Sequence, residues 1–123
     1  MALLPGFGPT LALALEMALA PLLGGNADTD GPRVRIQTTA ATEALLPAAL
    51  MAVIADTAES FSARAIGIQI DGIRPVDGGY RLWGLVQIDP NQPARAIPTP
   101  ETCSIARDGM GFFVTLAIET PDL

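Results

Sequence analysis

The segment Arg64–Asp89, RAIGIQIDGIRPVDGGYRLWGLVQID, predicts an antiparallel pair of strands at about 64–73 and 79–89. Apolar side chains share one face in each strand: Ile66, Ile68 and Ile70 in the first, and Tyr80, Leu82, Val86 and Ile88 in the second. A two-residue turn at Asp77-Gly78 would pair Ile70 with Leu85 and place the two apolar sets on opposite faces. Both apolar sets must face the same core and so lie on the same face of the sheet. We therefore predict an odd-numbered loop or a β-bulge at Gly72.

A second hairpin is predicted at the C-terminal end of the chain. Asp108-Gly109 is a strong two-residue turn signal between expected strands at 102–107 and 110–119. This turn would set Ile105 opposite Phe112 and Cys103 opposite Val114. Both pairs are apolar, so the register is self-consistent. The C-terminal half is therefore expected to form a four-stranded antiparallel meander.

The N-terminal half predicts a helix, a strand and a second helix. Thr10 is the expected N-cap of the first helix, and the segment 21–25 ends it. Its core face carries Leu11, Leu15, Ala18, Leu19 and Leu22, and its other side is also apolar, with Leu13, Met17 and Ala20. A helix that is apolar all round needs cover on more than one side, which a neighbouring subunit can supply.

The next two elements have the clearest periodicity. Alternation over 33–38 predicts a half-buried strand. The second helix starts near Thr42, or near Leu46 if Pro47 takes the first helical position, and runs to about Phe61. Its apolar stripe consists of Leu50, Val53, Ile54, Ala58 and Phe61. We therefore predict one α+β domain over 1–123, with two helices packed on a mainly antiparallel sheet of about five strands.

Composition excludes most catalytic chemistry. The chain of 123 residues has no histidine, one cysteine, and seven basic residues that are all arginine. General acid/base catalysis near neutral pH, Schiff bases and transition-metal sites usually rely on histidine, lysine or several cysteines. We therefore expect a non-enzymatic protein with no catalytic residues, no cofactor and no metal. Cys103 has no partner for an internal disulfide and is interpreted as a small buried hydrophobe.

Charge and hydropathy also bear on the partners. A net charge of -6 disfavours non-specific attraction to nucleic acid or anionic lipid. Among the N-terminal 25 residues only Glu16 is charged, so this segment could be mistaken for a signal peptide or a membrane span. It lacks the basic start of a signal peptide, and prolines and glycines interrupt it too often for a membrane span. With only 16% charged residues, the chain is expected to bury apolar surface against other chains.

Two motif candidates carry little weight. The segment 26–31, NADTDG, resembles the start of an EF-hand calcium loop, but the twelfth position is Gln37 and a strand follows instead of a helix. We therefore interpret it as a solvated turn. Carboxylate pairs such as Asp71 and Asp89 occur by chance among thirteen acids, and nothing favours one pair.

Three sets of residues are candidates for an interface. The sheet face opposite the core carries Trp83, Leu85, Phe113 and Ala117, which either the N-terminal helix or another subunit would cover. The proline-rich arm 89–101 joins two strands, and its Arg95 and Ile97 are expected either to contact a partner or to belong to an ordinary surface crossover. Leu13 and Met17 lie on the second side of the first helix.

In this order of elements and in size, the chain resembles the tail-terminator and head-tail joining proteins of long-tailed bacteriophages. That resemblance implies a non-enzymatic homo-oligomeric ring, with the apolar sheet face, the N-terminal helix and the proline-rich arm as contact surfaces. It rests on architecture alone, so it assigns no residue roles.

A second resemblance is to NTF2-like domains, in which helices and a curved sheet enclose a small-molecule pocket. It implies a small-molecule pocket but transfers no functional residues; the chain's only obvious polar candidates for such a pocket are Tyr80, Asp71 and Arg81.

We expect an assembly subunit that forms a homo-oligomer, in its specific version a component of a virion neck or tail. It would be cytoplasmic, or part of the virion if encoded by a phage, and would bind other assembly proteins but neither membrane nor specific nucleic acid sequences. The alternative is a small-ligand-binding or isomerase-like pocket protein.

Overall fold

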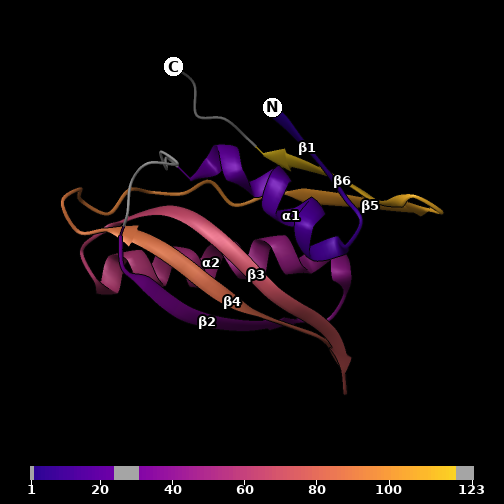
Figure 1. Cartoon of the computed structure of the whole chain (residues 1–123), viewed down its shortest axis with the longest axis horizontal. Helices are drawn as coiled ribbons and strands as arrows, with labels where there is room; N and C mark the ends of the chain where they lie inside the picture. Colours follow the sequence, from indigo (N-terminus) through magenta and orange to yellow (C-terminus); the bar gives the residue numbers. More distant parts are fainter. Residues whose placement is uncertain (1, 24–30, 119–123) are drawn as a thin grey trace.

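The computed structural model describes residues 2–23 and 31–118, which form two helices and two three-stranded antiparallel sheets (Figure 1). Sheet A has the order β1-β6-β5 and sheet B the order β2-β4-β3. Along the chain the elements are β1 (Ala2–Gly8), α1 (Leu11–Leu19), η1 (Ala20–Leu22), β2 (Arg33–Ala40), η2 (Glu43–Leu45), α2 (Leu46–Ser60), β3 (Arg64–Val76), β4 (Gly79–Asp89), β5 (Thr102–Asp108) and β6 (Gly111–Ile118).

The α+β class is confirmed, but the single sheet of about five strands and the four-stranded meander are wrong. The two predicted hairpins belong to different sheets, because the connection 90–101 carries the chain from β4 to the start of β5. The first strand, β1, was not predicted. It contains Pro5, which is tolerated because β1 is an edge strand that pairs only with β6.

Glycines in β1 explain how α1 packs so closely on sheet A. A Cβ added at Gly6 would lie 2.0 Å from the carbonyl oxygen of Ala14, and one at Gly8 would lie 2.9 Å from the Cβ of Leu13. Only hydrogen fits between strand and helix at Gly6. The glycines of this segment therefore mark a close approach of two backbones, not a loop.

Helix α1 begins and ends as the sequence predicts. The Thr10 hydroxyl accepts a hydrogen bond from the amide of Leu13 at 3.2 Å, and Pro21 lies in the 3₁₀ turn that ends the helix. The predicted core face is buried, with the exception of a half-buried Leu22, and Ala14 joins it. Leu13 and Met17 remain exposed.

One polar side chain links α1 to sheet B. The backbone amide of Ile70, in the edge strand β3, donates a hydrogen bond to the Glu16 carboxylate. Edge strands leave backbone groups without ladder partners, and a buried unpaired amide is costly. The hydrogen bond to Ile70 thus explains why the apolar segment 1–25 contains one charged residue, Glu16.

Sheet B confirms the predicted irregularity at Gly72. The turn is the two-residue Asp77-Gly78, since Val76 pairs with Gly79, and the register then shifts between Ile70 and Gly72. The extra residue brings Ile70 opposite Gly84 and restores Ile70 to the face of Leu82 and Val86, all of which are buried. A second shift, between Ala65 and Gly67, was not predicted.

Helix α2 covers one face of sheet B, and the strands cross in front of it in Figure 1. Pro47 lies in its first turn, as the later of the two predicted starts requires. Leu50, Ile54 and Ala58 are buried as expected, while Phe61 at the C-cap is exposed. The predicted strand before it runs two residues further, to Ala40.

The register of the β5–β6 hairpin differs from the prediction by two residues. Ile105 pairs with Val114 and Cys103 with Leu116, because Asp108 is the last strand residue and not part of the turn. Its carboxylate accepts hydrogen bonds from the amides of Met110 (2.7 Å) and Gly111 (3.1 Å). An aspartate before a turn stabilises it in this way. The two-residue turn therefore lies one residue later than predicted, at Gly109-Met110.

Candidate functional site

Exposed apolar side chains gather around the first strand. We call Leu3, Phe7, Leu13, Met17 and Phe113 the β1 edge surface; each is between 46% and 63% exposed. Leu3 and Phe7 come from β1, Leu13 and Met17 from α1, and Phe113 from the neighbouring β6. Isolated exposed apolar residues are ordinary, but contiguous ones on neighbouring elements are typical of a contact surface.

Contacts within the β1 edge surface show that its parts are adjacent. Phe7 and Phe113 are directly opposite each other across the β1–β6 ladder, with ring centroids 6.4 Å apart and planes tilted by 54°. The amide of Phe7 donates to the sulfur of Met17 at 3.4 Å, so this amide points away from β6. Among the described strands none pairs with the outer side of β1. The surface therefore combines apolar side chains with an open strand edge.

The sequence located three of these five residues: Leu13, Met17 and Phe113. Leu3 and Phe7 were missed because the segment MALLPGFG was not interpreted as a strand. In the structure exposure alternates along this strand, with Leu3, Pro5 and Phe7 on the outer face and the glycines inside, but the sequence has no alternation of apolar and polar residues that would reveal it.

The expected shared face of Trp83, Leu85, Phe113 and Ala117 does not exist. Trp83 and Leu85 lie on β4 in sheet B, whereas Phe113 and Ala117 lie on β6 in sheet A. The assumption of one meander produced this error. Trp83 is half-buried because its ring lies over Gly72, where an added Cβ would come within 2.1 Å of the ring. A cross-strand aromatic of this kind covers backbone that glycine leaves bare.

The structure ties the proline-rich arm to its own chain. Ile97 is partly buried against the core and Pro100 is buried, while Arg95 is exposed. At the start of the arm, the Asp89 carboxylate accepts hydrogen bonds from the side chain of Gln92 (2.7 Å) and the amide of Asn91 (2.9 Å). These bonds, together with the charge of Arg64, lower the pKa of Asp89. Ile97 thus has an intramolecular role, and Arg95 is the residue of the pair that is free to meet a partner.

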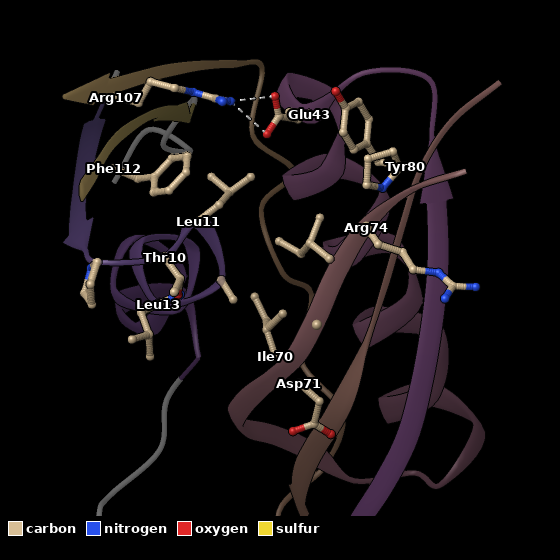
Figure 2. Close-up of a pocket in the computed structure, with 15 residues that line it drawn as sticks. Thr10, Leu11, Leu13, Glu43, Ile70, Asp71, Arg74, Tyr80, Arg107 and Phe112 are labelled. Carbon is tan, nitrogen blue, oxygen red and sulfur yellow. Dashed lines mark hydrogen bonds and ion pairs between the residues drawn. The ribbon is translucent and has the colours of Figure 1, made fainter. Parts of the chain in front are cut away.

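A groove of about 610 Å³ lies between the start of α1 and the edge of β3 (Figure 2). Leu11, Phe112 and Ile70 form apolar walls. At one end Arg107 makes an ion pair with Glu43 at 3.0 Å, and Asp71 lies at the other end. The ionisable groups of this groove therefore do not converge on one point. In a small-molecule site with polar specificity they would converge.

Two of the three polar residues expected for a pocket, Tyr80 and Asp71, border this groove. Arg81 does not, and lies instead beside the turn of the β3–β4 hairpin. The possible calcium loop, Asn26–Gly31, falls almost wholly outside the described residues. Within the described part of the chain, no cluster of three or more possible metal ligands occurs, and no helix is long and apolar enough to cross a membrane.

Cys103 provides a test of packing beneath sheet A. Burial raises the pKa of its thiol to about 11. The reactive thiolate therefore accumulates only as the pH approaches that value, whereas the thiol of the unfolded chain ionises near its ordinary pKa of about 8.5. At pH 8 we expect the folded chain to react with a disulfide reagent on the order of 100-fold more slowly than the chain in guanidinium. Equal rates in the two states would show that Cys103 is not shielded.

The chain matches no protein-family model, and a search of curated proteins finds no relative of it.

Proposed function

We propose that this protein is a non-enzymatic assembly subunit that forms a homo-oligomer through its β1 edge surface. The observation that carries the proposal is the combination of five exposed apolar side chains with an open strand edge. Another copy of the chain supplies both partners that such a surface needs, a strand edge and an apolar patch. The more specific version is a ring-forming component of a phage virion neck or tail, which rests on the resemblance in architecture.

Substitution of Phe113 tests this proposal. Phe113→Asp places a charge in the β1 edge surface, beside the ring of Phe7, and we expect self-association to weaken by at least about 30-fold, the loss typical of an aromatic hot spot. The measurement is the solution mass by light scattering over a concentration series. Met110→Asp is the matched control, because Met110 is 80% exposed at the hairpin turn and outside the surface.

The outcomes separate clearly. A wild-type chain that stays monomeric at all concentrations contradicts the proposal. So does a Phe113→Asp variant that associates as tightly as the Met110→Asp control.

The groove supports a second candidate function, binding of a small apolar ligand. Its volume of about 610 Å³ falls within the usual range for ligand sites, and part of its wall is apolar. Under this alternative, an environment-sensitive apolar dye binds the monomer at one site, and Phe112→Asp, at a partly buried position of the wall, abolishes its binding while the chain stays folded. An assembly subunit whose groove has no ligand shows no saturable dye binding there.

A further inference from the structure

The uncovered face of sheet B is basic, although the chain as a whole is acidic. Four of the seven arginines point away from α2 on this face, with Trp83 and Leu85 between them. The register places Thr39, Arg81 and Arg74 in one row across the three strands and Arg35, Leu85 and Gln69 in another. We call Arg33, Arg35, Arg74, Arg81, Trp83 and Leu85 the basic face.

No carboxylate pairs with these arginines in the described part of the chain. The one ion pair found there joins Arg107 to Glu43, which lies elsewhere. Asp71 borders the basic face, but its carboxylate accepts a hydrogen bond from Gln69 at 2.7 Å. The Nε of Arg81 is buried without a hydrogen-bond partner. Arg74 and Arg81 are direct cross-strand neighbours, and like charges in that position repel each other. The face therefore gains from an anionic partner.

The opposite side of the same two layers has the complementary character. Exposed residues of α2 and of the residue before it form a stripe at helical spacing: Leu45, Ala52, Asp56 and Glu59. The two acids lie near the helix C-terminus, whose partial negative charge adds to theirs. The alanine leaves room for a large side chain such as Trp83. We call these four residues the α2 stripe.

We propose that the basic face of one copy binds the α2 stripe of a second copy. This inference rests on the proposed function, and it adds a second contact between copies to that of the β1 edge surface. The basic face and the α2 stripe lie on opposite sides of the two layers formed by sheet B and α2. One neighbour related by a two-fold axis therefore cannot contact both surfaces of the same copy. The contact is head-to-tail, and its repetition gives a ring or an open filament.

The two surfaces also match in length. From Arg33 to Thr39 the basic face extends about 20 Å at the usual strand rise. From Leu45 to Glu59 the α2 stripe extends about 21 Å at 1.5 Å per residue. Trp83 and Leu85 provide the apolar centre between the two arginine pairs, and the acids at one end of the α2 stripe face the pair Arg33 and Arg35.

A second copy is a better occupant than a polyanion such as single-stranded nucleic acid. The net charge of -6 repels a polyanion. A second copy can instead present the acids of its α2 stripe to the basic face, because these acids lie on the other side of the molecule. The half-buried ring of Trp83 lies over Gly72 and offers only part of its surface for base stacking.

Charge reversal on each surface, separately and together, tests the contact. Arg33→Glu/Arg35→Glu reverses one end of the basic face, and Asp56→Arg/Glu59→Arg reverses the α2 stripe. We expect each double variant to weaken assembly on the order of 100-fold, because like charges then meet across the contact. Combined in one chain, the four changes keep the wild-type net charge and are expected to restore the wild-type mass. Met110→Asp, at the turn of the β5–β6 hairpin and outside both surfaces, is the control and is expected to assemble normally.

The readouts are solution mass and the fluorescence of Trp83, the only tryptophan. Assembly should protect Trp83 from acrylamide, and the two double variants should lose this protection while keeping the wild-type melting temperature within a few degrees. A wild-type chain that associates while both double variants keep its mass overturns the head-to-tail contact but leaves the proposed function standing. A monomeric wild type overturns both. Binding of an oligothymidylate that Arg33→Glu/Arg35→Glu abolishes without a change in mass overturns the inference in favour of a polyanion.

Discussion

Gly6→Ala is expected to destabilise the fold by about 3 kcal/mol or more, the upper part of the range for overpacking in a tight contact. The added Cβ would lie 2.0 Å from the Ala14 carbonyl oxygen and 2.7 Å from the Ala18 amide nitrogen. Both are backbone atoms of α1, so neither can move without displacing the helix from sheet A. Chemical denaturation at a concentration where the chain is dissociated measures the free energy of unfolding.

Gly109→Ala is the matched control for Gly6→Ala. No atom lies within 4 Å of a Cβ added at Gly109, and its φ is not in the left-handed region. We expect the stability of this variant to remain within about 0.5 kcal/mol of wild type, as is usual for surface substitutions. Equal stability of the two variants would show that β1 does not pack against α1 as described.

Leu15→Ala should lower the free energy of unfolding by about 3–4 kcal/mol, the usual cost of a cavity at a fully buried leucine. Leu15 is completely buried in the hydrophobic core. Leu13 provides the matched control on the same helix, because it is 46% exposed. Leu13→Ala should cost less than about 1 kcal/mol in the dissociated chain but weaken self-association.

The comparison of these two leucines distinguishes folding from assembly. Equilibrium denaturation gives the stability of each variant, and light scattering gives its mass. If Leu13→Ala destabilises the dissociated chain as much as Leu15→Ala, then α1 is covered on both sides within one chain, and Leu13 does not belong to a free surface.

Local rules predicted the individual elements well. The parity of the isoleucines in β3 against Leu82 and Val86 in β4 predicted either an odd-numbered loop or a bulge at Gly72, because a one-residue slip would have exposed a full apolar set, and the structure has the bulge. The capping preference of Thr10 predicted the start of α1, and the φ preference of Pro47 gave the later of two predicted starts, which is the start of α2.

The assignment of strands to sheets was not predictable in this way. Two hairpins joined by a long segment pair locally whether they share a sheet or not, and no short-range rule distinguishes the two cases. The pairing of β1 with β6 depends on residues at opposite ends of the described chain. Consequently Trp83 and Phe113 were assigned to one surface although they belong to two, and the segregation of arginines on sheet B went unnoticed.

Because the first strand pairs with the last, sheet A can form only late in the synthesis of the chain. On the ribosome, β2, α2, β3 and β4 emerge and can complete sheet B before β6 exists. During that interval β1 has no ladder partner, and its apolar residues Leu3 and Phe7 remain accessible to any neighbouring nascent chain. On a polysome, the native pairing of β1 with β6 therefore has to compete with contacts between the first strands of neighbouring chains.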